Sequence, residues 1–492
     1  MYLLPTTEHP EKLAVSIVFP LTEEQAVAVQ KKKDKTASEG LIAQVIRDGD
    51  FKGEKDQLVV VHTHATIKPK HLILVGLGKQ EELDLEKIRR AFSLVVQKAK
   101  AMKLEKFGVL LQFEKVKEQD ALRAVAEGLL LSDYKFTKYK TEDRDKIRQI
   151  KDVLLLVKKI DYVKDVLAET QIVCEAVHFM QDMQNENADV MTTLMIEKIA
   201  RDLAKKYALK ITVFDEKQLK KMGMNLLLAV GNGSRYPPRF IVLEYNGVSS
   251  GDATALLGKG ITFDSGGLNL KPTKFIETMK DDMSGAALVL GVLKAAAELK
   301  LRKNLIGVIP TAENMIGSKA YKPGDVYLSY AGISVEIGNT DAEGRLILAD
   351  ALAYTEKHLK PTRMIDFATL TGAIVVTFGD YVAGMMGTDK ETMKKLFDAG
   401  QKTYERVWEL PLYDEYLEET KSDIADVNNL GYWPNASSIM GAAFLKKFVQ
   451  NIPWTHVDIA GTAWWDKQRY YTPKGGTGFG VRLMIEYLKN LS

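Results

Sequence analysis

Strand-like and helix-like segments alternate, with short loops between them, along residues 190–492. Runs rich in Val, Ile and Leu have the length of strands, and the longer segments between them have the apolar periodicity of helices. Consecutive parallel strands need such crossover helices, so the alternation predicts a mostly parallel central sheet covered on both faces. The expected strands are Leu226–Val230, Phe240–Leu243, Ala255–Leu257, Leu305–Ile309, Met364–Ala368 and His456–Ile459, and the expected helices are Met283–Lys300, Gly344–His358 and Thr392–Tyr404.

The N-terminal third shows the same alternation on a smaller scale. Leu58–His62 and Leu72–Val75 are expected to be strands, and the apolar spacing over residues 160–185 predicts one long helix. We therefore expect an α/β protein with three parts: a smaller N-terminal α/β domain (1–160), a linker helix (161–185) and a larger C-terminal α/β domain (186–492).

Charge and cysteine content narrow the functional classes. The chain carries 68 Lys and Arg against 65 Asp and Glu, and this net charge of +3 gives no bulk attraction for nucleic acid or anionic membranes. Lysine-rich stretches in the N-terminal domain leave local DNA binding open, although such charge runs are usually solvated surface. The single cysteine, Cys174, excludes internal disulfides and thiolate metal clusters. We find neither a signal peptide nor an apolar run of about 20 residues, so no membrane association is expected and the cytoplasm is the expected location.

Three glycine-flanked segments carry the charged residues that indicate chemistry. They are Gly258–Lys271, Met279–Ala286 and Gly338–Leu346, and each is expected to follow a strand or to begin a helix. In open α/β sheets, ligands bind beyond the carboxyl ends of the strands, so the three segments are expected to meet there.

Four of the carboxylates in these segments are candidate metal ligands: Asp264, Asp282, Asp341 and Glu343. Four buried like charges take up protons unless they are countered, and two divalent cations would supply the matching charge. Oxygen ligands suit Mg²⁺, Mn²⁺ or Zn²⁺, and two ions about 3.5–4 Å apart form a clamp found in aminopeptidases, phosphatases and nucleases. The alternative interpretation is that each acid merely caps a helix or forms a surface ion pair.

Other catalytic arrangements fit the sequence poorly. No His-Glu-x-x-His motif occurs, and His178, His358 and His456 lack metal-ligand spacing, so they are expected to be structural. Neither Ser234 nor Ser265 fits the Gly-x-Ser-x-Gly elbow of hydrolases, and no phosphate-binding Gly-x4-Gly-Lys-Ser/Thr loop is present.

At these segments the sequence resembles the leucyl aminopeptidase (cytosol aminopeptidase) family. The octapeptide Asn-Thr-Asp-Ala-Glu-Gly-Arg-Leu at Asn339–Leu346 is the family's signature, and Gly258–Lys271 is similar to a second family block. Asp366–Ala373, Pro237–Arg239 and Thr472–Arg482 match further blocks. The resemblance covers residues 170–492 well and the N-terminal third only loosely.

The resemblance implies a metal-dependent exopeptidase with two divalent ions per subunit, manganese or zinc, with magnesium or cobalt as alternatives. Lys259, Asp264, Asp282 and Glu343 would hold one ion, and Asp264, Asp341 and Glu343 the other. A lysine can be a ligand only as a neutral amine, so a nearby cation and burial would have to lower its pKa. Asp264 and Glu343 would bridge the two ions.

The resemblance also implies the catalytic and substrate-binding groups. Lys271 would stabilise the oxyanion of the tetrahedral intermediate, and Arg345 would hold a bicarbonate that acts as general base while a metal-bound water attacks. The free N-terminus of a peptide would bind one ion, and Leu370 would offer its backbone to the substrate's peptide unit. Leucine or another apolar residue is expected in a side-chain pocket formed by Met279, Thr369, Gly372, Ala460 and Ala463. The family further implies a homohexamer.

Two stretches depart from the family pattern. Gln184–Asp189 lacks a proline that is usual there, and Gly431–Ala436 lacks an expected arginine. Two other functions stay open at this point: a two-metal phosphoesterase, which would share the carboxylate clamp, and a DNA-binding regulator, since some bacterial relatives also bind DNA.

Overall fold

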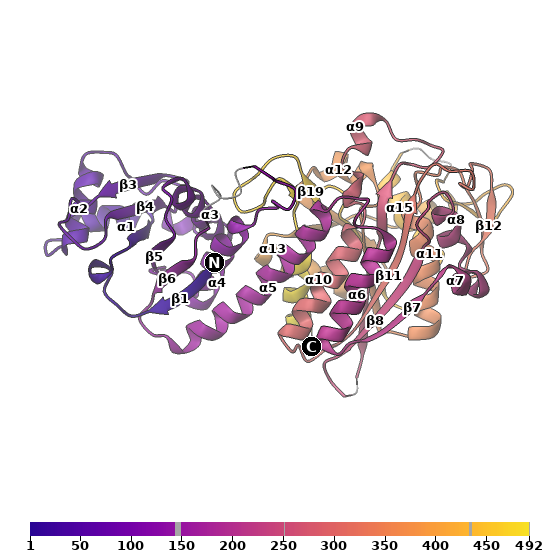
Figure 1. The fold of residues 1–492 in the computed structure, drawn as a ribbon, viewed down its shortest axis with the longest axis horizontal. Helices are drawn as coiled ribbons and strands as arrows, with labels where there is room; N and C mark the ends of the chain where they lie inside the picture. The colour runs from indigo at the N-terminus through magenta and orange to yellow at the C-terminus, as the bar shows by residue number, and fades with distance from the viewer. Residues whose placement is uncertain (143–148, 250, 432–434, 492) are drawn as a thin grey trace. The chain divides into compact units, whose positions relative to one another are not determined.

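A computed structural model describes residues 1–142, 149–249, 251–431 and 435–491 of the chain. These residues form two compact units, which Figure 1 shows as ribbons. The N-terminal unit contains Met1–Glu175 and Lys467–Pro473, and the C-terminal unit contains Ala176–Asp466 and Lys474–Ser492. A single long helix, α5 (Asp161–Asn185), spans the predicted linker. The domain limits predicted at residues 160 and 186 stay a prediction.

The N-terminal unit is built on a six-stranded sheet in the order β1-β6-β5-β2-β4-β3, in which only β3 runs antiparallel to its neighbour. Its strands are β1 (Tyr2–Thr6), β2 (Ser16–Leu21), β3 (Leu58–His62), β4 (His71–Gly76), β5 (Lys106–Leu110) and β6 (Asp152–Leu156). Helices α1 (Glu23–Lys31) and α2 (Ala37–Arg47) cover one face, and α3 (Leu85–Ala101) and α4 (Glu118–Asp133) cover the other. Alternate strand residues therefore fill two separate apolar cores.

A short segment from late in the chain, Lys467–Pro473, completes the N-terminal unit. The Tyr471 hydroxyl donates to Glu86 Oε2 at 2.9 Å, and the Tyr470 hydroxyl donates to Asp56 Oδ2 at 2.9 Å. Arg90 lies over the Tyr470 ring, 4.8 Å from its centroid. The N-terminal unit is thus discontinuous in the sequence.

The C-terminal unit contains a nine-stranded sheet in the order β16-β15-β18-β14-β9-β11-β8-β7, with β10 paired to β11. The central strands β18, β14, β9 and β11 are parallel, whereas β15 is antiparallel to β18, and β8 is antiparallel to both β11 and β7. The strands are β7 (Lys210–Phe214), β8 (Arg239–Asn246), β9 (Ala253–Gly258), β10 (Gly260–Asp264), β11 (Asn304–Asn314), β14 (Arg363–Ala368), β15 (Val382–Gly387), β16 (Arg406–Glu409) and β18 (Trp454–Asp458).

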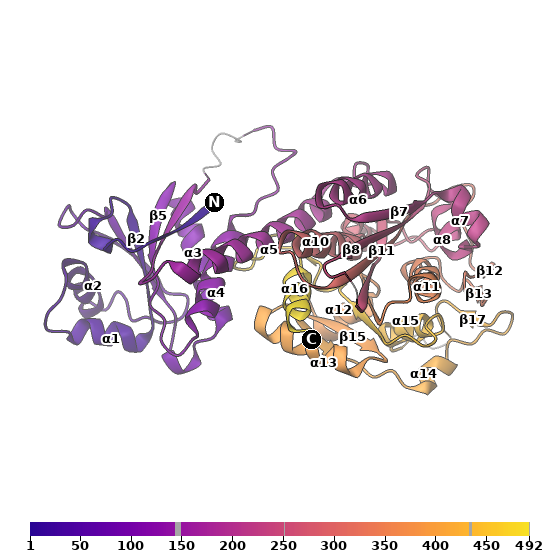
Figure 2. The same ribbon diagram turned by 90° about the horizontal axis from the view of Figure 1, so that it is seen from below.

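Helices cover both faces of this sheet, as Figure 2 shows. One face carries α6 (Thr193–Tyr207), α10 (Ser284–Glu298), α13 (Lys390–Thr403) and α16 (Val481–Asn490); the other carries α8 (Asn225–Gly231), α11 (Gly344–Tyr354), α12 (Gly372–Phe378) and α15 (Ser437–Lys446). Smaller elements are α7 (Glu216–Met222), α9 (Thr273–Ile276), α14 (Asp414–Glu418), a three-stranded sheet of β12 (Val326–Leu328), β13 (Ser334–Glu336) and β17 (Val427–Asn428), and the pair β19 (Trp464–Trp465) and β20 (Gly475–Gly476). The predicted α/β class, with two units and mostly parallel sheets, is confirmed.

One predicted strand is wrong. Leu226–Val230 lies in helix α8, because Oδ2 of Asp350 accepts the backbone N–H groups of Leu226 and Leu227 at 3.0 and 3.1 Å. Asp350 belongs to α11, and its carboxylate satisfies N–H groups that the first turn of a helix leaves without partners. A run of apolar residues cannot distinguish a buried strand from a buried helix, and here a distant acid favours the helix.

The other predicted elements agree with the structure. The remaining strands lie in β8, β9, β11, β14 and β18, and the three predicted helices correspond to α10, α11 with the turn that follows it, and α13. A search of the described helices finds none that is long and apolar enough to cross a bilayer.

Candidate active site

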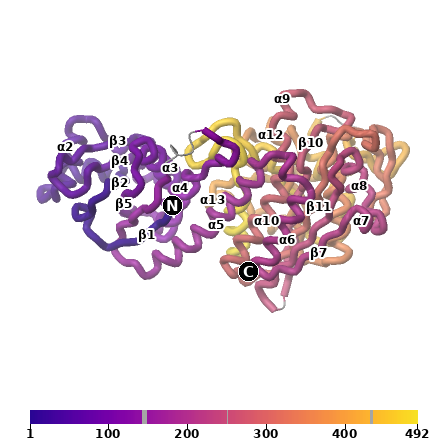
Figure 3. Tube along the Cα trace, viewed as in Figure 1, coloured from indigo at the N-terminus to yellow at the C-terminus, as the bar shows by residue number. Residues whose placement is uncertain are grey.

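The charged residues meet where strands of the C-terminal sheet end. Lys259 joins β9 to β10, Asp264 is the last residue of β10, and Thr369 directly follows β14. Asp282 precedes α10 and Glu343 precedes α11, so both acids lie at helix N-termini, where the helix dipole favours negative charge. Figure 3 shows β10 and α12 at the same edge of this unit. The three charged segments therefore meet at the carboxyl ends of the strands, as the sequence predicted.

Lys259 is buried among acids. Its Nζ lies 2.8 Å from Asp282 Oδ1 and 2.7 Å from Glu343 Oε1, and it donates to the Thr369 carbonyl at 2.8 Å. Burial alone would lower the pKa of Lys259, but the two carboxylates outweigh it and raise the pKa above its ordinary value. Since only a neutral amine can ligate a metal, ligation by Lys259 requires the release of this proton.

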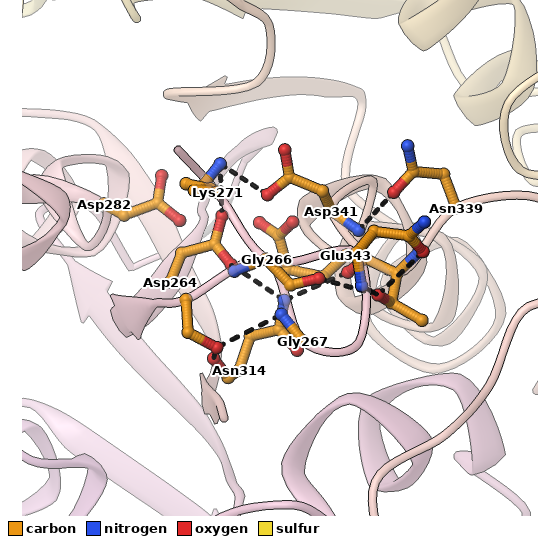
Figure 4. A network of polar contacts seen from close by, with 12 residues as sticks. Asp264, Gly266, Gly267, Lys271, Asp282, Asn314, Asn339, Asp341 and Glu343 are labelled. Atoms are coloured by element: carbon orange, nitrogen blue, oxygen red, sulfur yellow. Dashed lines mark hydrogen bonds and ion pairs between the residues drawn. The ribbon is translucent and has the colours of Figure 1, made fainter. Parts of the chain in front are cut away.

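Lys271 pairs with the other two acids. Its Nζ lies 2.9 Å from Asp264 Oδ2 and 2.5 Å from Asp341 Oδ1. Figure 4 marks both contacts with dashed lines. The side chain is 14% exposed, so this ammonium group, unlike that of Lys259, can be reached from solvent. The same acids raise the pKa of Lys271 against the effect of burial.

A glycine turn and one asparagine hold Asp264 in place. Its Oδ1 accepts the Gly266 N–H at 2.8 Å and the Asn314 Nδ2–H at 2.7 Å. Asn314 also donates to the Thr340 carbonyl at 3.0 Å. It therefore connects the loop after β10 to the signature loop, which is the part of Asn339–Leu346 that precedes α11 (Figure 4). Gly266 has φ +84°, and a Cβ there would lie 2.4 Å from the Asn269 carbonyl oxygen, so only glycine fits.

The cluster has more negative than positive charge. Burial raises the pKa of Asp264 to about 7, and burial likewise raises the pKa of Asp282 and Asp341. Glu343 differs, because Lys259 and Lys271 outweigh its burial and lower its pKa. Two ammonium groups face four carboxylates, so the ionised cluster has an unbalanced charge that favours bound cations.

The donor set fits divalent metal ions. Asp264, Asp341 and Glu343 each place a carboxylate oxygen within 4.8 Å of the others. Asp282 Oδ2 is buried and accepts no hydrogen bond from any described residue, which leaves it able to bind a cation. Hard oxygen donors of this kind suit Mg²⁺, Mn²⁺ and Zn²⁺.

Arg345, on α11, is buried beside the cluster. Its Nη1 donates to the Asn429 carbonyl at 2.7 Å, while its Nε has no hydrogen-bond partner among the described residues. Burial lowers the pKa of Arg345 to about 10, although Glu343 and Asp458 favour its charged form. A buried guanidinium with an unused N–H group suits a small anion.

The residues predicted to bind substrate lie in three segments: the turn at Met279, residues 369–372 and residues 460–463. Thr369 Oγ1 donates to Asp282 Oδ1 at 2.6 Å, so this residue directly adjoins the acids. Both Leu370 and Ala460 direct their backbone N–H groups to Asp458 Oδ1, at 3.1 and 3.2 Å. The other three occupy element ends: Met279 begins the turn before Asp282, Gly372 begins α12, and Ala463 directly precedes β19.

Sequence reasoning missed three buried polar residues that hold the site together: Asn314, Asn429 and Asp458. Asn429 accepts the Gly338 N–H at 2.8 Å and donates to the Asn339 carbonyl at 2.8 Å, which fixes the signature loop. Asn314 and Asp458 end strands β11 and β18, so their position at the same sheet edge was an available signal. Asn429 lies outside the regular helices and strands, so the sequence pattern offered no signal for it.

A buried ion pair lies deeper in the same strands. His456 Nδ1 is 2.6 Å from Asp366 Oδ1, and Trp454 Nε1 donates to Asp366 Oδ2 at 2.7 Å. Burial opposes the charging of His456, but Asp366 outweighs it and raises the pKa of the ring above 6.5.

Comparison with known proteins decides the family. A model of the cytosol aminopeptidase family, catalytic domain, matches residues 178–485, and a model of the family's N-terminal domain matches residues 17–143. The chain belongs to the cytosol aminopeptidase family. Membership places it among metal-dependent aminopeptidases, and the carboxylate cluster agrees with this class.

Relatives in the cytosol aminopeptidase family match nearly the whole chain. A probable cytosol aminopeptidase of Geotalea uraniireducens is 44% identical over 456 residues, covering 92% of this chain and 92% of the relative. A probable cytosol aminopeptidase of Protochlamydia amoebophila is 43% identical over 460 residues, covering 91% and 90%. Among solved structures, the bottromycin maturation enzyme BotP in complex with Mn has a TM-score of 0.84 at 30% identity, covering 96% of this chain and 98% of BotP.

The structure describes the first departure from the family pattern and only part of the second. In the first, Asn185 ends α5, its Oδ1 accepts the Gly476 N–H at 3.1 Å, and its carbonyl accepts from Lys280 Nζ at 2.8 Å. In the second, Gly431–Ala436, residues 432–434 lie outside the described part of the chain.

Proposed function

We propose that this protein is an aminopeptidase that removes leucine or another apolar residue from the free N-terminus of peptides. The observation that carries the proposal is the cluster of four carboxylates and Lys259 at the strand ends, in which only Asp341 is partly exposed. Lys259, Asp264, Asp282 and Glu343 would hold one divalent ion, and Asp264, Asp341 and Glu343 would hold the second. When bound, such ions polarise a carbonyl group and lower the pKa of a bound water, which makes it a nucleophile near neutral pH.

Lys271 suits the stabilisation of an oxyanion. Its ammonium group is held by Asp264 and Asp341 and is partly exposed, so a substrate carbonyl can approach it. The raised pKa of Lys271 keeps it positively charged at neutral pH. A fixed cation near developing negative charge lowers the barrier of acyl transfer.

Arg345 suits a bicarbonate that acts as general base. Its Nε has no partner among the described side chains and carbonyls, and Glu343, two residues before Arg345 in the chain, favours its charged form. Arg345 would hold and orient the bicarbonate, which would supply a general base to the site.

Met279, Thr369, Gly372, Ala460 and Ala463 would form the side-chain pocket, and Leu370 would bind the substrate's peptide unit. The small and apolar character of most of these residues favours leucine or methionine at the N-terminal position of the substrate. We also propose manganese or zinc as the native metal, a homohexameric assembly and a cytoplasmic location. BotP, which is described with Mn, supports the choice of manganese.

Metal removal and replacement tests the proposal. The protein as purified is assayed on leucine p-nitroanilide, then treated with a chelator, and then supplied with Mn²⁺, Co²⁺ or Zn²⁺. We expect chelation to abolish activity and added metal to restore it, with no cleavage of N-acetylated substrate. Full activity in protein that elemental analysis finds metal-free would refute the two-metal site, and hydrolysis of a chromogenic phosphate ester in place of the anilide would favour a phosphoesterase.

A further inference from the structure

The buried carboxylate of Asp458 connects two of the three segments that are proposed to bind substrate, those of Leu370 and Ala460. Asp458 is the last residue of β18 and has no exposed surface. Its Oδ1 accepts the N–H groups of Leu370 and Ala460 at 3.1 and 3.2 Å. Leu370 lies in the loop after β14, and Ala460 lies in the loop after β18. The pairing of these two strands ends at Ala368 and Asp458, so one carboxylate oxygen joins the two loops just beyond the end of the paired strands.

The second oxygen of Asp458 extends this connection to two helices. Oδ2 accepts the Thr371 hydroxyl at 2.6 Å, and the oxygen of that hydroxyl also caps α12 by accepting the Ile374 N–H at 3.3 Å. Thr371 Oγ1 lies 2.8 Å from the hydroxyl of Ser438, on α15. Because the single proton of Thr371 goes to Asp458, Ser438 donates to Thr371.

We infer that Asp458, acting with Thr371, is a positioning residue that sets the aminopeptidase's preference for the N-terminal side chain of its substrate. This inference rests on the proposed function. Asp458 does not itself touch substrate. It fixes the Leu370 backbone relative to the Ala460 wall of the pocket, and this spacing decides how large a side chain fits.

The geometry implies that a loss at Asp458 or Thr371 changes substrate recognition and leaves metal binding intact. Neither residue belongs to the proposed ligand set, and Thr369, the nearest residue that contacts Asp282, keeps its own hydrogen bond. Loosening of the pocket weakens ground-state and transition-state binding together, so KM should rise more than kcat falls.

Thr371→Val is the sharpest test, because it keeps the side-chain shape and removes only the hydroxyl. We expect kcat/KM for leucine p-nitroanilide to fall by about tenfold, mainly through KM, since a buried carboxylate oxygen loses its donor. The preference for leucine over alanine p-nitroanilide should fall by roughly three- to tenfold, the scale on which pockets discriminate apolar side chains. Thr371→Ser retains the hydroxyl and should restore both values.

Asp458→Asn is the second variant. The amide oxygen can still accept from Leu370 and Ala460, but the amide nitrogen replaces the acceptor of the Thr371 proton. Its effects should therefore have the same direction as those of Thr371→Val and be smaller.

Thr455→Val provides the matched control. Thr455 is buried on the same strand β18, and its hydroxyl has no hydrogen-bond partner among the described residues. This control should keep the wild-type KM and the wild-type preference. All variants are measured at saturating Mn²⁺ with metal content determined in parallel.

Three results would overturn the inference. One is wild-type KM and preference in Thr371→Val and Asp458→Asn. Another is an equal loss for both substrates with a lowered melting temperature, which indicates a purely structural role. The third is a loss of metal in these variants. A wild-type protein that cleaves neither anilide under these conditions refutes the proposed function itself, and the inference with it.

Discussion

Replacement of Lys271 by methionine should separate the electrostatic balance of the cluster from its chemistry. The substitution keeps much of the side-chain volume and removes the ammonium group that faces Asp264 and Asp341. Asp264 is almost fully buried, so its charge loses a close partner that water cannot replace.

The size of the effect follows from burial. Removing one partner of a buried ion pair typically costs about 3–5 kcal/mol. In a unit of this size, each kcal/mol corresponds to roughly 1.5–2 °C, so the melting temperature of metal-free protein should fall by about 5–10 °C. The pKa of Asp264 is already raised to about 7, and the substitution raises it further. When the pKa of a carboxyl group is raised in the folded state, the folded state loses stability as pH rises towards and through that raised pKa. The loss of stability in Lys271→Met, relative to the wild type, should therefore be larger near pH 8 than near pH 6.

Thermal melts of metal-free and Mn²⁺-saturated protein measure this effect. Metal ions should supply the missing positive charge, so saturation should remove most of the deficit. Catalysis should not recover, because Lys271 is proposed to meet charge that develops only in the transition state; kcat should stay about 10²–10³-fold low. A rate that recovers fully at saturating Mn²⁺ would show that Lys271 only balances charge.

Lys294→Met is the matched control. Lys294 is 13% exposed and pairs with Glu298 at 2.8 Å on α10, away from the cluster. It should lower the melting temperature by at most a few degrees, equally with and without metal. An equal response of the two variants to metal would refute the electrostatic argument.

Four other substitutions test separate parts of the site and the strands beneath it. Asp264→Ala and Glu343→Ala should each lose both ions and all activity while still folding, and elemental analysis that finds two metals per chain in either variant would contradict their bridging role. Arg345→Ala should retain both ions but lose activation by added bicarbonate, with kcat lowered about 10²–10⁴-fold in steady-state assays at saturating Mn²⁺. Asp366→Asn removes the partner that raises the pKa of His456. A histidine whose pKa is raised in the folded state stabilises the fold at pH values below its unfolded pKa of about 6.5, and this stabilisation is lost as pH rises through the folded pKa. Urea titrations should therefore show that Asp366→Asn lowers the free energy of unfolding more near pH 6 than near pH 9.

The charged residues of the site could be predicted because each lies in a local pattern. Asp264, Asp282 and Glu343 are flanked by glycines or begin helices, and strand-helix alternation places all of them at one sheet edge. The number of like charges brought together then favours a metal site, and the resemblance at Asn339–Leu346 narrows the expected chemistry to an aminopeptidase. Local sequence was sufficient because the acids are attached directly to the ends of regular elements.

The supporting residues could not be predicted, because their partners are distant in the chain. Asp350 holds α8 from 123 and 124 residues away, and this contact converts an apparent strand into a helix. Asn429 fixes a loop 90 residues before it, and Asp458 acts on Leu370 across 88 residues. A side chain whose function is to join two loops has no periodicity of its own.

The return of Lys467–Pro473 to the N-terminal unit means that the backbone passes between the two units three times. A single proteolytic cut near Glu175 therefore severs only one of these passages. The fragment Met1–Glu175 would stay associated with the rest of the chain through the hydrogen bonds of Tyr470 and Tyr471 to Asp56 and Glu86. A nicked protein should elute as one species under native conditions and as two in denaturant, and a gene fragment that stops at Glu175 encodes an incomplete unit.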